Sequence, residues 1–119
     1  MKRDADLLRE LLFKLEQERD YVSHVDVDKD SSDQGRVEYG HLLLLDDDGL
    51  IELSGRYRNT VRITNRGHDF IAAVRSESIW AKAKAAASNA GTATVSMLFE
   101  VALAYGKREL KQATGIDLP

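Results

Sequence analysis

The chain has 119 residues, of which 43% are hydrophobic and 31% charged, a balance that excludes the disordered classes and allows a folded domain with its own core. Cysteine is absent, which excludes disulfides, thiolate zinc sites and a cysteine nucleophile. The net charge of -3 disfavours a protein whose whole surface attracts nucleic acid, and no apolar stretch approaches the roughly 20 residues of a membrane span, so we expect a cytoplasmic protein.

The first half of the chain predicts a helix, a short strand and a second helix. Leucines recur at helical spacing, which predicts a helix over residues 4–20. Residues 21–27 alternate between apolar and polar types, as a short half-buried strand does. After a polar loop, the second helix is expected to begin near residues 33–35, to span about residues 37–47 and to end at Gly49, a residue type that tolerates the left-handed conformation.

A β-hairpin and three further helices are expected in the rest of the chain. Two alternating runs, residues 50–53 and 60–64, flank a segment that contains a glycine, which predicts the hairpin. Asn65 is a candidate N-cap for the helix that follows it. The three helices are expected over residues 66–74, 76–87 and 94–114.

This order of elements predicts an α+β, mainly α, fold with a winged helix-turn-helix core. The core is expected to hold a helix, a short strand, a helix and a β-hairpin wing within residues 1–75. Residues 76–119 are expected to form a C-terminal helical extension that packs on the core or mediates dimerisation, within a single domain overall. The run of residues 41–51 resembles the H-L-x-x-L-x-x-x-G-L-[IV] run that closes the recognition helix and opens the wing in bacterial winged-helix regulators. In this run Leu42 and Leu45 would anchor the helix.

Several segments of the chain resemble one family. The first residues read M-K-R-D-A-D-L, and the resemblance continues in four later segments, residues 39–42, 49–51, 63–70 and 79–84. The family consists of small bacterial and phage proteins and is a domain of unknown function (family 2513). The resemblance implies a winged-helix-like fold and no established activity. Gly40 departs from the tyrosine-histidine pair expected in that family and lowers helix propensity at its position.

Arginines gather in the expected wing and at the start of the helix after it, with no acidic residue over residues 54–66. Arginines neutralise phosphates and enter minor grooves, so the wing is a candidate contact with double-stranded DNA. The start of the helix before the wing would face a major groove. The candidate DNA-binding residues are Arg36, Tyr39, Arg56, Arg58, Asn59, Arg62 and Arg66. The alternative interpretation is a solvated loop with scattered arginines.

The helix before the wing also has features of a protein interface. Leu43 and Leu44 make it apolar nearly all round, which is typical of a helix covered on both sides. Three aspartates near its end, residues 46–48, would repel phosphate. The final helix offers a second dimerisation surface, whose alternative role is packing back across the first helix. The candidate interface residues are Leu43, Leu44, Phe99, Leu103 and Tyr105.

No motif predicts a metal, a cofactor or an active site. Three alternating aspartates imitate the start of a calcium loop, but Ser31 stands at its glycine position and Val37 at its glutamate position. The histidines are scattered, which favours side chains bonded within or at the edge of the core over a zinc site. A nucleophile elbow and a phosphate-binding glycine loop are both absent, so we expect a protein that is not an enzyme. These aspartates and histidines are Asp26, Asp28, Asp30, His24, His41 and His68.

The sequence therefore supports two hypotheses. The first is a DNA-binding regulator of a bacterial or phage operon that acts as a homodimer, with the helix from Arg36 in the major groove and the wing on the phosphate backbone. The alternative is a non-catalytic module that uses a winged-helix fold to bind a protein partner or a second copy. The acidic balance and the Leu43-Leu44 pair favour this alternative.

Overall fold

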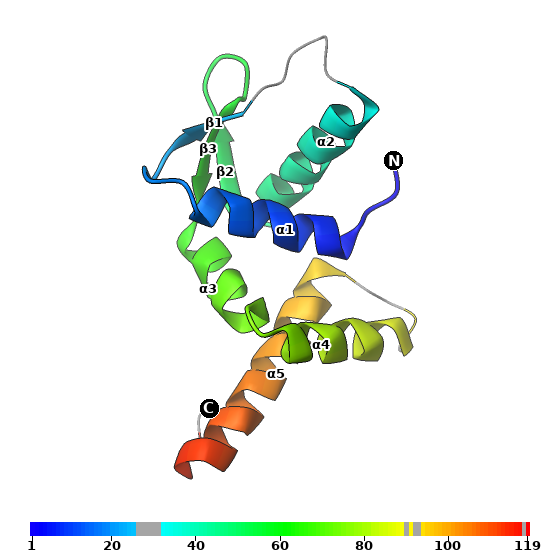
Figure 1. The fold of residues 1–119 in the computed structure, drawn as a ribbon, viewed down its shortest axis with the longest axis vertical. Helices are drawn as coiled ribbons and strands as arrows, with labels where there is room; N and C mark the ends of the chain where they lie inside the picture. Colours follow the sequence, from blue (N-terminus) through cyan, green and yellow to red (C-terminus); the bar gives the residue numbers. More distant parts are fainter. Residues whose placement is uncertain (26–31, 90, 92–93, 118) are drawn as a thin grey trace. The chain divides into compact units, whose positions relative to one another are not determined.

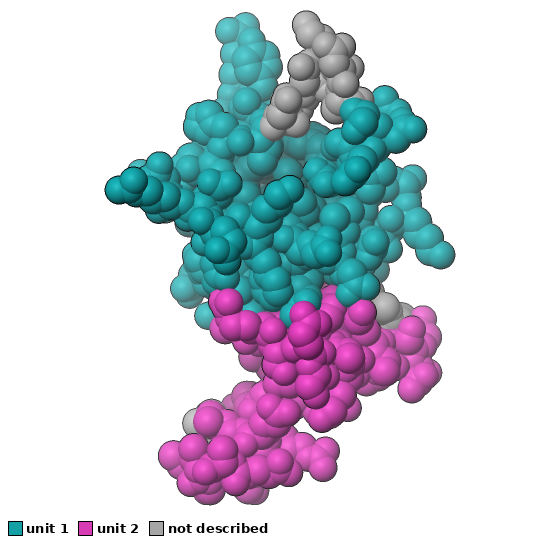
Figure 2. All heavy atoms as spheres, in the orientation of Figure 1, with its two compact units in different colours: residues 1–71 teal, residues 72–119 magenta. Residues whose placement is uncertain are grey.

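A computed structural model describes residues 1–25, 32–89, 91, 94–117 and 119 (Figure 1). The chain divides into two compact units, Met1–Ile71 and Ala72–Pro119 (Figure 2). The α+β, mainly α, class is confirmed, because helices and one small antiparallel sheet make up the described elements. Over the described ranges no helix is both long and apolar enough to cross a membrane.

The first helix, α1, spans Ala5–Glu16 and is followed by the short strand β1, Ser23–His24. The Oδ1 atom of Asp4 accepts hydrogen bonds from the amides of residues 6 and 7 at 3.0 and 3.3 Å, which caps the helix. α1 ends earlier than residue 20, because Leu15 is its last apolar residue at helical spacing. β1 is shorter than the predicted strand. Residues 26–27 of that strand lie outside the described residues, as do the three alternating aspartates of the rejected calcium loop.

The second helix, α2, spans Asp33–Asp47 and so begins at the earlier of its expected starts. Its N-cap is Ser32, whose Oγ accepts a hydrogen bond from the amide of Gly35 at 3.2 Å. A helix-turn-helix consists of two helices joined by a short turn. Between β1 and β2, the described residues contain one helix, α2. The winged-helix interpretation therefore stays a prediction.

The sheet has the strand order β1-β3-β2 and is antiparallel throughout. β2 is Ile51–Ser54 and β3 is Thr60–Ile63, which confirms the predicted hairpin. Ile51 and Leu53 are buried while the two residues that alternate with them are exposed, as expected for a strand with one face on a core. Buried side chains of α1, α2 and the hairpin form that core: Leu8, Leu11, Leu12, Leu42, Leu45, Leu50, Ile51, Leu53 and Val61.

Thr64 joins the hairpin to the third helix, α3, which spans Asn65–Val74. Its Oγ1 accepts a hydrogen bond from the amide of Gly67 at 3.0 Å and donates one to the carbonyl of Gly49 at 2.5 Å. Its amide donates to the carbonyl of Leu50 at 3.1 Å. The helix cap is therefore Thr64, and the prediction that Asn65 is the cap is wrong, because Asn65 already lies within the helix.

The second unit contains the fourth and fifth helices, α4 (Glu77–Asn89) and α5 (Val95–Thr114), which pack against each other. The hydroxyls of Ser76 and Thr94 accept the capping hydrogen bonds at 3.2 and 3.1 Å. α5 ends at Gly115, which adopts a positive φ of 76°. From Leu103 onward most side chains of α5 are exposed, and Figure 1 shows this part of α5 extending past α4.

Candidate nucleic-acid interface

The β2–β3 hairpin, residues 51–63, is the element predicted to be the wing, and we use that name for it. Its tip stands out from the surface of the first unit (Figures 1 and 2). The tip is closed by a hydrogen bond from the amide of Arg58 to the carbonyl of Gly55 at 3.2 Å. Arg58 adopts a positive φ of 51°, a backbone conformation that residues other than glycine seldom take. This turn leaves Arg56, Tyr57 and Arg58 exposed.

Two side chains of α2 attach the wing to that helix. Asp46 accepts hydrogen bonds from the amide of Leu53 at 3.0 Å and from the guanidinium of Arg58 at 2.8 Å. The hydroxyl of Tyr39 donates a hydrogen bond to the carbonyl oxygen of Arg58 at 2.9 Å. Arg58 is therefore bound to α2 through both its backbone and its side chain, and this fixes the position of the wing tip against α2.

Three of the predicted DNA-binding arginines form ion pairs with acids nearby. Arg36 pairs with Asp33 on α2, Arg58 with Asp46, and Arg62 with Glu52 across the hairpin at 3.5 Å. The arginine side chains in these pairs are 68%, 55% and 44% exposed. Exposed ion pairs contribute only about 0–1 kcal/mol. Arg36 and Arg62, whose acid partners are also exposed, can therefore exchange their carboxylate for a phosphate at little cost.

The other predicted DNA-binding residues have different surroundings. The Cζ atom of Arg56 lies 5.6 Å from the ring centroid of Tyr57, and the side chain is exposed at the wing tip. The Nε of Arg66 donates a hydrogen bond to the carbonyl oxygen of Asp48 at 3.3 Å, just beyond the end of α2. Asn59 is half-buried at the end of the tip. The structure therefore brings Tyr39 to Arg58 at the wing tip, whereas Arg66 lies at the base of the wing beside the end of α2.

The helix that was expected to enter a major groove is acidic. α2 carries four acidic residues and one arginine, and that arginine is already paired with one of the acids. Leu43 and Leu44 are half-buried, and Val37 is 37% exposed. Met1 lies over Gly40, where an added Cβ would meet its sulfur. The outer side of α2 is thus apolar and acidic, which suits a protein contact better than a phosphate contact.

The predicted interface residues of the final helix differ in exposure. Phe99 is only 7% exposed, so little of its side chain is accessible to a partner. Leu103 is 38% exposed, and Tyr105 is half-buried with the Nζ of Lys82 5.7 Å from its ring centroid. Leu103 and Tyr105 therefore present more surface than Phe99.

The three histidines do not share one site. His41 is fully buried: its Nδ1 donates a hydrogen bond to the carbonyl of Val37 at 2.8 Å, and its Nε2 accepts one from the amide of Asp4 at 2.9 Å. The expectation of a histidine bonded within the core is confirmed for His41, whereas His24 and His68 are exposed. In the part of the chain that the structure describes, no three histidine or acidic side chains converge in a way that would hold a metal ion.

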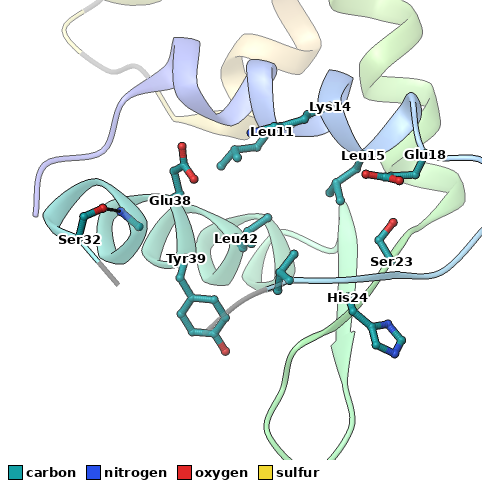
Figure 3. Close-up of a pocket in the computed structure, with 12 residues that line it drawn as sticks. Leu11, Lys14, Leu15, Glu18, Ser23, His24, Ser32, Glu38, Tyr39 and Leu42 are labelled. Atoms are coloured by element: carbon teal, nitrogen blue, oxygen red, sulfur yellow. Dashed lines mark hydrogen bonds between the residues drawn. The ribbon is translucent and has the colours of Figure 1, made fainter. Parts of the chain in front are cut away.

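Sequence reasoning missed a cavity of about 330 Å³ that lies among α1, β1 and α2 (Figure 3). Its walls come from three successive elements and depend on how these elements pack, so no local pattern indicates it. Tyr39 lines this cavity with its ring and also holds the wing with its hydroxyl.

Comparison with known proteins gives one match. The profile of a family described as hypothetical protein (DUF2513) matches residues 2–93, which is more than half of the chain. Neither the curated proteins nor the solved structures contain a match. This result agrees with the family resemblance that the sequence motifs indicate.

Proposed function

Because the chain belongs to the DUF2513 family of hypothetical proteins, whose description specifies no activity, we infer its function from the geometry and propose that it binds double-stranded DNA through the wing. One observation carries this proposal. Residues 51–63 hold three exposed arginines and a single acid, Glu52, on a hairpin whose tip is well exposed. Arginines on a projecting hairpin neutralise phosphates and enter minor grooves.

In this proposal the wing makes the main contact and α2 supports it. The four acids of α2 would repel the phosphates that flank a major groove, so α2 is not proposed to insert there. Instead Tyr39 and Asp46 hold Arg58 and the tip in a defined position before DNA binds. The resemblance of residues 41–51 to winged-helix regulators supports a non-catalytic role in the transcription of a bacterial or phage operon.

The proposal predicts that removing two wing arginines weakens DNA binding and its salt dependence. In the Arg56→Ala/Arg62→Ala variant, the slope of log K against log salt should fall by about 0.9 for each phosphate that the wing no longer neutralises. Arg58 is left in place, because its bonds to α2 hold the tip. The measurement is fluorescence anisotropy of a duplex from the upstream region of the gene and of an unrelated duplex, at several salt concentrations.

The control for this experiment is Arg108→Ala, which removes an exposed arginine from α5 and leaves the wing unchanged. It should leave both the affinity and the slope as in the wild type. If the double variant binds with an unchanged slope, the wing does not contact phosphate. If the wild type binds neither duplex even at low salt, the DNA-binding proposal is wrong.

The outer side of α2 favours a second candidate function, which is self-association through that helix. Val37 is exposed there, and half-buried Leu43 and Leu44 add to the apolar surface. A Val37→Glu variant would add a charge to this side without weakening the helix, because glutamate is a good helix former. It should therefore convert a dimer to a monomer. Light scattering after gel filtration measures the mass, and Val37→Thr is the uncharged control. A wild-type protein that is monomeric at high concentration would contradict this candidate.

A further inference from the structure

The cavity among α1, β1 and α2 has the size and the lining of a small-molecule site. Its volume of about 330 Å³ lies at the lower end of the roughly 300–1,000 Å³ of ligand cavities. Apolar side chains from α1 and α2 face it, and polar groups stand among them (Figure 3). The apolar residues of the lining are Leu11, Leu15, Val25 and Leu42. A cavity of this kind favours a compact ligand with an apolar body.

The charged residues around the cavity indicate whether its ligand is a cation or an anion. Glu38 is half-buried, whereas Lys14, Glu18 and His24 are exposed. Figure 3 shows the Glu38 carboxylate directed from α2 toward α1. One of its oxygens accepts a hydrogen bond from Gln34, at the long distance of 3.3 Å, and a carboxylate can accept several more. A carboxylate beside an apolar surface is suited to pair with a cation.

We propose that this cavity binds an organic cation, whose apolar body packs on Leu15 and Val25 and whose protonated amine pairs with Glu38. Leu15 and Val25 are half-buried and present apolar surface to the cavity, whereas Leu11 and Leu42 also line it but are only 7% and 5% exposed. Lys14 is exposed and can turn its amine to solvent, where it does not oppose the ligand.

Tyr39 links the cavity to the wing. Its side chain lines the cavity, and its hydroxyl donates a hydrogen bond to the carbonyl oxygen of Arg58, which itself does not line the cavity. A ligand that packs against the Tyr39 ring restricts the motion of the ring and, through this hydrogen bond, of the wing tip. Binding in the cavity is thereby coupled to the position of Arg58. The consequence of this coupling for DNA affinity rests on the proposed function, whereas the coupling itself does not.

The test is an amide NMR titration of the full chain, without DNA, with three probes of one shape and different charge. The probes are tryptamine, which is a cation, tryptophol, which is neutral, and indole-3-acetate, which is an anion. Tryptamine should shift the amide signals of cavity residues such as Leu11 and Leu42 and also that of Arg58. It should bind at least about fivefold more tightly than the other two probes, as expected for one charge-assisted contact.

The Glu38→Gln variant should bind tryptamine no more tightly than tryptophol. The control is Glu10→Gln, on the exposed side of α1 and outside the cavity, which should keep the preference for tryptamine. Equal binding of the three probes, or no binding of any, would overturn the proposal. Equal loss of preference in both variants would overturn the role of Glu38. Shifts confined to the cavity, with none at Arg58, would overturn the link to the wing. Because the titration contains no DNA, its outcome is independent of whether the protein binds DNA.

Discussion

Replacing Gly67 by alanine is expected to lower the free energy of unfolding of the first unit by about 3 kcal/mol or more, which is a large part of the stability of a small domain. Gly67 is buried in the first turn of α3. An added Cβ would overlap the carbonyl oxygen of Leu50 and lie 2.8 Å from Cγ2 of Ile63. The oxygen belongs to the backbone next to β2, and Thr64 binds the same carbonyl, so neither segment can move away freely. Urea unfolding followed by circular dichroism measures the loss.

The matched control is Gly106→Ala, which also removes a glycine from a helix. Among the described residues, and apart from its chain neighbours and its own helix backbone, no heavy atom lies within 4 Å of the position that the added Cβ would take. Alanine there should raise the stability by about 0.5–1 kcal/mol, because glycine is the poorer helix former. Opposite signs for the two variants would show that the close approach of α3 to Leu50 is responsible. If Gly67→Ala unfolds at the wild-type urea concentration, this close approach is absent in solution.

The predictable part of the fold is the part that depends on near neighbours in sequence. The leucine spacing indicates α1, and the alternation around Ile51 and Leu53 indicates the hairpin, because burial of one face imposes those periods. The prediction that Asn65 caps α3 is wrong, because Thr64 is the cap. Both residue types cap helices well, and the choice is decided by a hydrogen bond from Thr64 to Gly49, fifteen residues earlier. Periodicity contains no information about such a contact.

The candidate site depends even more on distant contacts. From the sequence, Asp46 is expected to repel phosphate, whereas in the structure it bonds to the amide of Leu53 and to the side chain of Arg58. Tyr39 is expected to face DNA, whereas its hydroxyl reaches the wing tip nineteen residues away. The arginines of the wing are visible in the sequence as a run without acids, but their carboxylate partners are not. The balance of charge therefore places the proposed DNA contact on the wing, because α2 holds four acids and one arginine whereas residues 51–63 hold three arginines and one acid.

His41 is the second position at which a large loss of stability is expected, because its side chain connects α2 to the start of α1. It is fully buried and uses both ring nitrogens, with Nδ1 bonded to the carbonyl of Val37 and Nε2 to the amide of Asp4. His41→Ala removes the ring and leaves the Asp4 amide without this partner. Because this hydrogen bond is part-buried, its loss costs about 1 kcal/mol, and the space left by the fully buried ring adds about 2 kcal/mol. We expect a total loss of about 3 kcal/mol in urea unfolding.

His68→Ala is the control for this variant, because His68 is an exposed histidine on a helix and its replacement should change the stability by no more than about 0.5 kcal/mol. The effect of His41→Ala should also be visible locally. Asp4 caps α1, so the loss of its bond to His41 should loosen the first turn of that helix. Hydrogen exchange should then speed up more at the first hydrogen-bonded amides of α1 than at the amides of β3. Equal acceleration in both elements would show that His41 stabilises the core as a whole and does not act through the start of α1.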